Sequence, residues 1–537
     1  MSSPRPIRFF HQGRVQSVEG LPPQTTVLQY LREHARCAGT KEGCAEGDCG
    51  ACTVLVGELD TDGEAVSLRA VNACIQFLPM LDGQALLTVE DLGASTDLGP
   101  VQQALVDCHG SQCGFCTPGF AMTMQAVYER HQACGTRPTR QDLADDLAGN
   151  LCRCTGYRPL LDAGERMFEQ PVRTLDRAPI VAALRGLRDD PALHYEARSR
   201  AGTPQRVFAP RTLEELAALR EAMPDARLVA GATDVGLWVN KQQRELGDVI
   251  LTGRVEDLRR IDVITVHGQG AAPGVMSANG HLSAGPAVAA AAVPAPTSRT
   301  TLRIGAAVPL EEAWAALAER VPALRELWLR FASPPVRNAG TLGGNVANGS
   351  PIGDGPPALI ALGARLVLRL GATLRAMPLE DFYLDYMKNA LRPGEFVEAV
   401  EVPEPPAGTR LRGYKIAKRY DSDISAVCAV LSLRLEDGVA RDVRFAFGGM
   451  AATVRRAAKA EAAVSGRAWN EASQAAAALA LTEDFTPMTD LRASAGYRQR
   501  VAANLIRRFW LETRADAPVA AASASVWQAI NLQRSVA

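Results

Sequence analysis

The cysteines of this chain are unevenly distributed, and their spacing constrains the fold more than any other feature. All but one of the 12 cysteines lie between Cys37 and Cys154, and only Cys428 lies outside that stretch. The start of the sequence has no continuous apolar segment and no small-residue cleavage site, so we expect an unexported, cytoplasmic protein with reduced thiols. Metal ligation therefore explains the cysteines better than a disulfide framework does.

The first cysteine set has the spacing of a plant-type [2Fe-2S] site. Its members, with four and then two intervening residues before a more distant fourth, are Cys44, Cys49, Cys52 and Cys74. Gly43, Gly47 and Gly50 allow the tight turns that bring backbone N–H groups toward cluster sulfur. A structural zinc site stays open as an alternative, although zinc modules favour paired two-residue spacings.

A second cysteine set follows in a region of helical periodicity. Its four thiols, each pair at an expected helix terminus, are Cys113, Cys116, Cys152 and Cys154. Helix N-terminal amides stabilise thiolate charge. This spacing by itself is less diagnostic than the first, and zinc would explain it nearly as well.

Two glycine-rich stretches in the second half of the chain indicate a nucleotide-type cofactor. Residues 228–235 give a strand, a Gly-Ala-Thr-Asp turn and a helix start, and residues 338–345 run on to Asp354 through further Gly, Ser and Asn. Both expose backbone N–H groups that can bind a pyrophosphate. An ordinary loop is the alternative. No G-x-G-x-x-G motif opens a βαβ unit, which argues against a Rossmann site.

The length of 537 residues predicts several domains rather than one core. Short strands are expected at 7–10, 53–56 and 85–89, and helices over 100–165, one with Pro118 after an N-cap at Thr117 and one from Thr139 to Gly149. Three prolines in 166–200 predict a linker rather than a core element. An Ala/Gly/Pro-rich surface insertion is expected at 265–299, and a hairpin at Asp437-Gly438 precedes a helix over 490–510.

Composition excludes two classes of partner. The formal net charge is -1, so there is no global field to attract nucleic acid or anionic lipid. The longest apolar run, at 287–296, is much shorter than the roughly 20 residues of a membrane helix. We therefore expect partners to be recognised by local sites.

Together, the two cysteine sets resemble the iron–sulfur part of the molybdenum hydroxylases, the family of xanthine dehydrogenase and aldehyde oxidase. The stretches at 228–235 and 338–354 are similar to the FAD domain of the same family. The resemblance covers nearly the whole chain, with the insertion at 265–299 as the main departure. The order of iron–sulfur modules and then flavin is that of the small subunit of two-chain bacterial xanthine dehydrogenases.

The resemblance implies a multidomain α+β fold. It places a β-grasp ferredoxin-like module at 1–92, a helical-bundle [2Fe-2S] module at 93–168, a linker at 169–200, a vanillyl-alcohol-oxidase-like FAD domain at 201–405, a C-terminal α+β domain at 406–515 and a tail at 516–537. It also implies that all eight motif cysteines ligate two [2Fe-2S] clusters and that Gln112 touches the molybdopterin of a partner. The implied FAD contacts are Leu228, Val229, Ala230, Gly231, Ala232, Thr233, Asp234, Val235, Phe331, Thr341, Asp354, Val397 and Lys415.

In that family scheme, electrons pass from molybdenum through the Cys113 cluster, the Cys44 cluster and FAD to NAD. The molybdopterin region is expected on a large subunit, in a two-plus-two heterotetramer, and no acid, base or nucleophile is expected on this chain. Xanthine or hypoxanthine oxidation is the favoured activity. A hydroxylase for aldehydes, nicotinate or acyl thioesters, or a zinc scaffold without redox function, are the alternatives.

Overall fold

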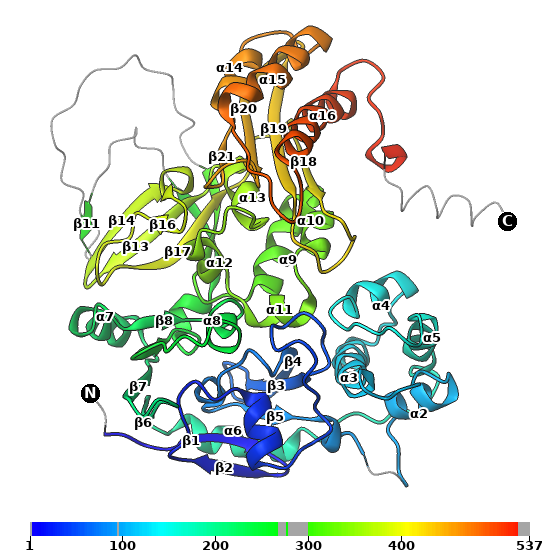
Figure 1. The fold of residues 1–537 in the computed structure, drawn as a ribbon, viewed down its shortest axis with the longest axis vertical. Coiled ribbons are helices and arrows are strands. Elements are labelled where there is room, and N and C mark those ends of the chain that lie inside the picture. Colours follow the sequence, from blue (N-terminus) through cyan, green and yellow to red (C-terminus); the bar gives the residue numbers. More distant parts are fainter. Residues whose placement is uncertain (1–2, 94–95, 267–274, 278–298, 525–537) are drawn as a thin grey trace.

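The computed structural model describes residues 3–93, 96–266, 275–277 and 299–524. Figure 1 shows the N-terminal sheet at one end of the molecule, a group of short helices beside it, two further sheets in the middle and a C-terminal sheet with helices at the opposite end. The cysteine-rich half and the glycine-rich half therefore form separate groups of elements that meet along a broad contact. The expected multidomain α+β class is confirmed.

The N-terminal module is a five-stranded sheet of order β2-β1-β5-β3-β4. β1 and β5 run parallel, whereas the other pairs are antiparallel. Its elements are β1 (Ile7–His11), β2 (Arg14–Val18), α1 (Val27–Gln29), β3 (Thr53–Leu59), β4 (Val66–Asn72) and β5 (Ala85–Leu87). The strands expected at 7–10, 53–56 and 85–89 are present, and the first cysteine loop connects α1 to β3.

Four helices form the second module: α2 (Pro100–Asp107), α3 (Thr117–Cys134), α4 (Arg140–Asp146) and α5 (Arg158–Arg166). Thr139 caps α4 as expected, because its side chain accepts from the N–H of Asp142, whose carboxylate accepts in return. Two details differ from the expectation. Cys116 and not Thr117 occupies the N-cap of α3, and α4 ends at Asp146, three residues before Gly149.

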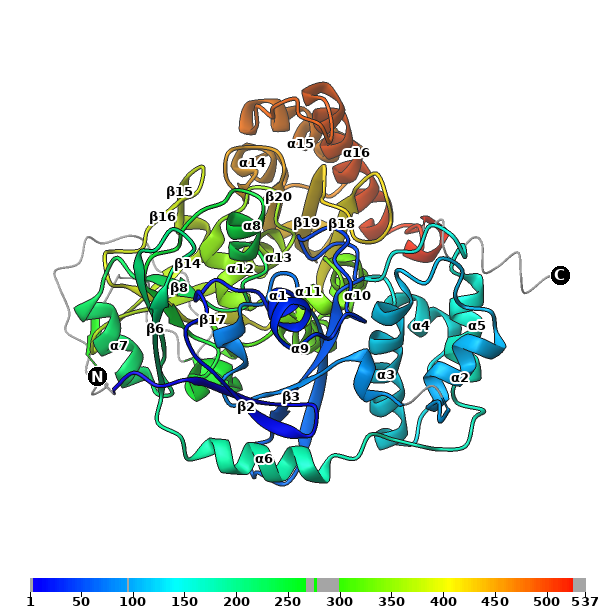
Figure 2. The ribbon, with the colours of Figure 1, turned by 60° about the horizontal axis from the view of Figure 1, so that its bottom comes forward.

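The segment 169–200 was expected to be a linker without core elements, and that interpretation is wrong. It contains α6 (Ala178–Arg188), which buries Ile180, Leu184 and Leu187 against β1 and β3, and β6 (Leu193–Arg198). Figure 2 shows α6 lying along the outer face of the N-terminal sheet. Proline at the second position of a helix is compatible with helical geometry, so prolines in this segment do not break α6.

The half of the chain with the glycine-rich stretches, residues 193–405, is called the flavin half after the cofactor that the resemblance implies. It contains two sheets. The first, of order β6-β7-β9-β8, combines β6 with β7 (Pro204–Ala209), β8 (Arg227–Val229) and β9 (Val249–Leu251), alongside α7 (Leu213–Ala222) and α8 (Val235–Asn240). The second is antiparallel, of order β10-β12-β17-β13-β14-β11. Its strands are β10 (Ile261–Val266), β11 (Val275–Ser277), β12 (Arg299–Gly305), β13 (Arg365–Leu370), β14 (Thr373–Pro378) and β17 (Phe396–Pro403). The expected insertion at 265–299 lies mostly outside the described residues.

Short helices and a hairpin complete this half. The helices are α9 (Leu310–Arg320), α10 (Arg325–Arg330), α11 (Pro334–Ala339), α12 (Leu342–Asn348) and α13 (Gly355–Ala361), and the hairpin strands are β15 (Tyr383–Asp385) and β16 (Lys388–Asn389). One hydrophobic core spans α9, the six-stranded sheet and α13. That core includes Leu342 and Val346 of the second glycine-rich stretch, whereas Val229 and Ala232 of the first pack in a core shared with the N-terminal sheet.

The C-terminal module is a four-stranded sheet covered by three helices. Its strands are β18 (Thr409–Ile416), β19 (Val427–Glu436), β20 (Val439–Gly448) and β21 (Arg455–Arg456), and its helices are α14 (Ala458–Val464), α15 (Glu471–Asp484) and α16 (Ala495–Thr513). β19 and β20 pair across Asp437-Gly438, as the hairpin signal predicted. The expected helix over 490–510 is present as α16.

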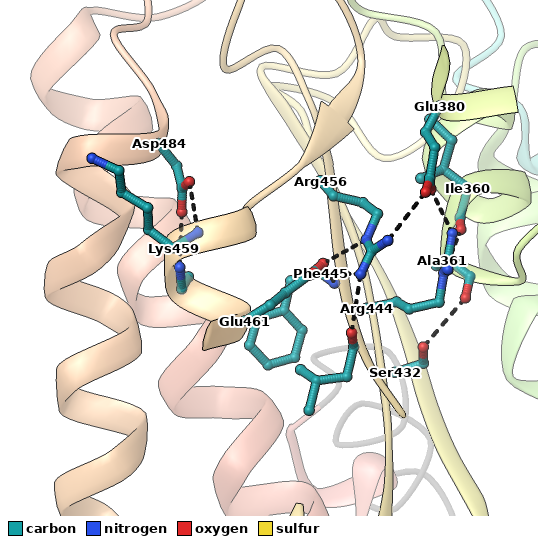
Figure 3. Close-up of polar contacts among 12 residues, drawn as sticks. Ile360, Ala361, Glu380, Ser432, Arg444, Phe445, Arg456, Lys459, Glu461 and Asp484 are labelled. Carbon is teal, nitrogen blue, oxygen red and sulfur yellow. Dashed lines mark hydrogen bonds and ion pairs between the residues drawn. The ribbon is translucent and has the colours of Figure 1, made fainter. Parts of the chain in front are cut away.

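A polar network joins the C-terminal module to the flavin half (Figure 3). Glu380 accepts from Arg444 at 2.5 Å and from Arg456 at 3.1 Å, so one carboxylate binds two arginines of the other module. Arg456 also binds Glu461 at 2.6 Å, and Glu461 accepts from the N–H of Phe445 at 2.7 Å. The bonds to Glu380 hold β20 and β21 against the short helix Leu379–Asp381, and those to Glu461 hold α14 against β20 and β21 within the C-terminal module.

Replacing Glu380 with Gln is expected to loosen this contact. Arg444 loses its only ion-pair partner in the described part of the chain and Arg456 loses one of two, so the C-terminal module should unfold at lower urea, with a loss of about 1–3 kcal/mol. Fluorescence of Trp469 and Trp510 during urea unfolding measures this. The control is Glu483→Gln, which removes only an exposed pair with Lys459. Equal effects of both substitutions would contradict the assignment.

Candidate metal and cofactor sites

The first cysteine set gathers its four thiols in one site. Cys44, Cys49 and Cys52 come from the loop before β3, and Cys74 directly follows β4, which pairs with β3 along its length. The Cys49 thiol hydrogen-bonds Cys44, the Cys74 thiol hydrogen-bonds Cys52, and a contact between Cys44 and Cys74 joins the two pairs. Cys52 and Cys74 are buried, whereas Cys44 and Cys49 are partly exposed.

Backbone N–H groups and a glycine lie close to the cysteine sulfurs of this loop. The N–H groups of Glu46 and Cys49 point at the Cys44 sulfur from 3.5 and 3.4 Å. A side chain on Gly43 would lie 2.8 Å from the Cys49 sulfur, so that position requires glycine. The pKa of Cys44 is held well below its usual range, first by the thiol hydrogen bond from Cys49 and then by that from Cys74. One thiol of the pair is thus prepared to be a thiolate ligand.

The second cysteine set forms two close pairs near the surface. Cys154 and Cys113 sulfurs are 3.6 Å apart, and the thiols of Cys116 and Cys152 are hydrogen-bonded. Cys113 and Cys154 are exposed. Burial raises the pKa of Cys116 to about 12. Burial also acts to raise that of Cys152, but hydrogen bonds from Thr155 outweigh it and the pKa is lowered.

The pairing of the thiols fits [2Fe-2S] clusters better than zinc. A structural zinc ion takes all four protein ligands at one centre, whereas a four-cysteine [2Fe-2S] cluster spreads its ligands over two irons. Within the described residues, no group of three or more His, Cys, Asp or Glu side chains is arranged around a single metal ion. Two adjacent pairs at each site are the donor set that two irons require.

The two cysteine modules contact each other through Gly50. The Asn150 amide donates to the Gly50 oxygen at 3.1 Å, and the N–H of Leu151 donates to the Cys49 oxygen at 3.0 Å. Gly50 has φ of +69°, and a side chain on it would lie 2.2 Å from the Gly149 oxygen. The residues flanking one site are therefore packed directly onto the residues flanking the other.

The two glycine-rich stretches meet in the flavin half. Residues 228–235 leave β8, turn at Gly231 and enter α8, and a side chain on Gly231 would lie 1.9 Å from the Ala339 oxygen. Thr341 caps α12 by accepting from the N–H of Gly344 at 3.1 Å. The close approach places the two loops on neighbouring turns, while at the start of α12 the N–H groups of Leu342 and Gly343 donate to the oxygens of Val308 and Ala306.

A buried polar cluster lies between α13 and β18. Lys415 Nζ binds Asp354 at 2.5 Å and Ser425 at 2.9 Å, and Ser425 donates to the second Asp354 oxygen at 2.5 Å. Asn345 on α12 has a buried Oδ1 without a hydrogen-bond partner in the described part of the chain. Buried polar atoms normally have partners. An unpaired acceptor together with the glycine-lined loops fits a bound FAD.

The remaining predicted flavin residues are less polar. Phe331 ends α10 and packs on Trp314 with ring centroids 5.8 Å apart. Val397 lies in β17 opposite Leu368, and both Phe331 and Val397 belong to the hydrophobic core of the flavin half. Sequence reasoning groups them with Lys415 and Asp354, whereas in the structure they support the sheet and helices around those residues.

The first cysteine site also contacts the flavin loop directly. The Asn240 amide, at the end of α8, donates to the oxygens of Cys74 at 2.7 Å and Ala45 at 3.1 Å. The Gln76 amide donates to the Gly231 oxygen at 3.0 Å. A side chain on Gly236 would lie 2.8 Å from Ile75, so α8 approaches the chain next to Cys74 closely. The cysteine site and the flavin loop are thus held together by short polar contacts.

Comparison with known families gives the same division of the chain. Residues 9–78 match the 2Fe-2S iron-sulfur cluster binding domain, and 88–165 match the [2Fe-2S] binding domain. Residues 201–270 and 295–405 match the FAD binding domain in molybdopterin dehydrogenase, and 412–513 match the CO dehydrogenase flavoprotein C-terminal domain. The chain belongs to the molybdenum hydroxylase family.

Individual relatives agree with this membership. The xanthine dehydrogenase of Drosophila subobscura is 32% identical over 83% of this chain and 34% of its own length. Aldehyde oxidase 4 of Cavia porcellus is 30% identical over 86% of this chain and 36% of its own length. This chain therefore spans about a third of these relatives. A carbon monoxide dehydrogenase structure from Hydrogenophaga pseudoflava has a TM-score of 0.47 at 27% identity, covering 56% of this chain and 94% of that one.

As a molybdenum hydroxylase chain, the molecule carries two [2Fe-2S] domains and an FAD-binding domain, and it serves in electron transfer. The expectation of these cofactors is confirmed, and a zinc scaffold no longer explains the sequence. Among the described helices, none combines the length and apolar character that crossing a bilayer requires.

Several residues that hold the sites together were not found by sequence reasoning. Asn150 was interpreted only as part of a helix end, although its place two residues before Cys152 is a usable signal. Gln76 and Asn240 carry no local motif, because their partners lie on distant segments. Their roles follow only from the tertiary contacts.

Cys116→Ser is expected to remove one cluster and leave the other. The variant should contain about half the iron of the parent protein and lose one of two reduced-state EPR signals, because a serine hydroxyl is a poor iron ligand. Cys108→Ser, in the same helical module but outside both sets, is the control and should retain all the iron. Full iron content in Cys116→Ser would contradict the ligand assignment.

Gly231→Ala is expected to weaken flavin binding. The added methyl group collides with the Ala339 backbone and separates the two glycine-rich loops, so the Kd for FAD should rise about tenfold or more while iron content is kept. FAD fluorescence titration measures the Kd. Gly186→Ala is the control, since no atom lies within 4 Å of the added carbon. An unchanged Kd for FAD would contradict the assignment of this loop.

Proposed function

We propose that this chain is the electron-transfer subunit of a xanthine dehydrogenase. It would pass electrons from a molybdenum centre on a partner polypeptide, through two [2Fe-2S] clusters and FAD, to NAD during oxidation of hypoxanthine and xanthine. The observation that carries the proposal is the order of matched modules, iron–sulfur first and flavin second, in a chain similar to xanthine dehydrogenases. We place the complex in the cytoplasm as a two-plus-two heterotetramer.

Eight cysteines are proposed as the iron ligands. The difference in burial between the two sites gives each a place in the transfer sequence. At the second site Cys113 and Cys154 are exposed, which suits a surface that receives electrons from a partner. At the first site Cys52 and Cys74 are buried, and Cys74 lies beside the flavin loop. Gln112 is exposed next to Cys113, so it is placed to contact the partner's molybdopterin.

We propose that the FAD contacts both glycine-rich loops, at 228–235 and at Thr341. It also contacts the buried pair Lys415 and Asp354 and the core side chains Phe331 and Val397. When bound, the clusters and the flavin supply one-electron relays and a two-electron acceptor. The protein's own contribution is to hold the loop at 228–235 against the turn before α12 and to keep the Lys415 cation paired with Asp354. Asp354 and Ser425 fix the Lys415 ammonium in one position.

An aldehyde hydroxylase is the second candidate, because the similarity to an aldehyde oxidase is nearly as high as that to xanthine dehydrogenases. The two functions differ in the partner chain and share the residues described above. Purifying the complete enzyme through a tag on this chain separates them. The proposal predicts a co-purifying molybdenum-containing chain and reduction of NAD by xanthine. Turnover of aldehydes but not of purines would replace it with the second candidate.

Gln112→Ala is expected to slow electron entry without changing the cofactors. Xanthine-driven reduction of the clusters in the complete enzyme should slow several-fold, because a side chain between the exposed cluster site and the partner is removed. Iron, FAD and reduction of a dye by NADH should stay unchanged, since those depend on the buried half. Gln141→Ala, at an exposed position on α4 of the same module, is the control. Equal rates in both variants would contradict the role of Gln112.

A further inference from the structure

A cavity of about 80 Å³ lies between the N-terminal sheet and the flavin half, behind the glycine-rich loops. One wall comes from β3 and β4, and the other from residues 251–259 together with Ala230, Asn338 and Thr341. Lys415 and Asp354 do not line it, whereas Ala230 and Thr341, two of the proposed FAD contacts, do. At that size it has room for several water molecules or a small ion.

The cavity carries more positive than negative charge. Three arginines approach a single carboxylate, that of Glu58, from Arg69 at 2.6 Å, Arg259 at 2.7 Å and Arg254 at 3.8 Å. Burial acts to raise the pKa of Glu58, but the three arginines outweigh it and lower the pKa to about 2. Glu58 is therefore ionised at neutral pH, and three cations face one anion.

The acceptors near these arginines are already in use. Both Glu58 oxygens are taken, since Gln84 donates to Oε1 at 2.5 Å while Arg69 and Arg259 hold Oε2. Asp82, the next acid near Arg254, is bound by Arg5 at 2.6 Å. On the outer side of Arg259, Glu256 and Glu312 add negative charge from a distance.

Some N–H groups of Arg69 and Arg254 therefore have no acceptor within the described part of the chain. The Nε of Arg69 is buried without a hydrogen-bond partner in the described part of the chain. Arg254, among the described residues, has the 3.8 Å ion pair with Glu58 and no hydrogen-bond acceptor. The side chains of Arg254, Arg259 and Arg69 are 28%, 32% and 20% exposed, so the N–H donors that remain on these guanidinium groups are within reach of a small anion from solvent.

We infer that this cavity binds a phosphate-type oxyanion, held by Arg254 and Arg259 of the flavin half together with Arg69 of the N-terminal sheet. A tetrahedral oxyanion offers several acceptors to guanidinium forks and neutralises the surplus charge. Its ligands come from both halves of the chain. The anion therefore strengthens the contact between the module that carries the first cysteine site and the module that carries the flavin loops.

The position of the cavity links its occupancy to that contact. Gln76, which lines the cavity, lies two residues from Cys74 and donates to the Gly231 oxygen. Thr341, which caps α12, lines the opposite side. An oxyanion here is in contact with the residues that hold the cysteine site and both glycine-rich loops together.

Isothermal titration calorimetry of the FAD-loaded full chain with inorganic phosphate tests the inference, in buffer of constant ionic strength. We expect saturable binding of phosphate that equal concentrations of chloride do not reproduce. Arg254→Gln should raise the phosphate Kd at least about tenfold, since it removes one charged fork. Arg254→Lys, which keeps the charge, should raise it less. Arg198→Gln, an exposed arginine of the flavin half bonded to Gly202, is the control and should leave it unchanged.

Two results would overturn the inference. Heat that chloride reproduces, or a Kd unaltered in Arg254→Gln, would mean that the cavity holds no specific oxyanion. FAD content, measured by absorbance in every variant, separates the remaining source of phosphate. If Arg254→Gln loses FAD while FAD-loaded parent protein binds no phosphate, the arginines serve the FAD pyrophosphate and the separate site does not exist. Phosphate binding with unchanged FAD content supports the inference.

Discussion

The loop that carries Cys44, Cys49 and Cys52 is the constraint on which the rest of the structure depends. Each neighbouring part of the chain is fitted to it: Asn150 of the helical module binds the Gly50 oxygen, and Asn240 of the flavin half binds the oxygens of Ala45 and Cys74. Electron transfer requires donors and acceptors at short separations, so these modules cannot be joined by a free linker. The polar contacts around this loop add to a hydrophobic core that the N-terminal sheet shares with the β6-β7-β9-β8 sheet.

The two cysteine sites differ in burial, and this difference follows from where their loops lie. The first loop is covered by α8 and by the turn before α5, whereas Cys113 and Cys154 are exposed at the ends of helices. An exposed site exchanges electrons with another molecule, and a buried one exchanges them within the chain. Under the proposed function, electrons would pass from the exposed thiols of the second site to the first site and on to the loop at Gly231.

Much of this was predictable from sequence, because the decisive signals are local. The cysteine spacing, the capping box at Thr139 and the turn at Asp437-Gly438 depend on neighbours within a few residues, and each is found as expected. The helix α6 and the strand β6 were missed because their apolar faces are short and their stability comes from packing on the N-terminal sheet. Contacts such as that between Gln76 and Gly231 join residues far apart in the chain, so no local sequence pattern predicts them.

The most direct test of the account is the EPR spectrum of the purified chain after reduction with dithionite, recorded with its visible absorption spectrum before reduction. The account predicts flavin bands on a broad iron–sulfur absorption and two distinct [2Fe-2S] signals, one for each cysteine set. A colourless protein that contains zinc without iron or flavin would contradict it.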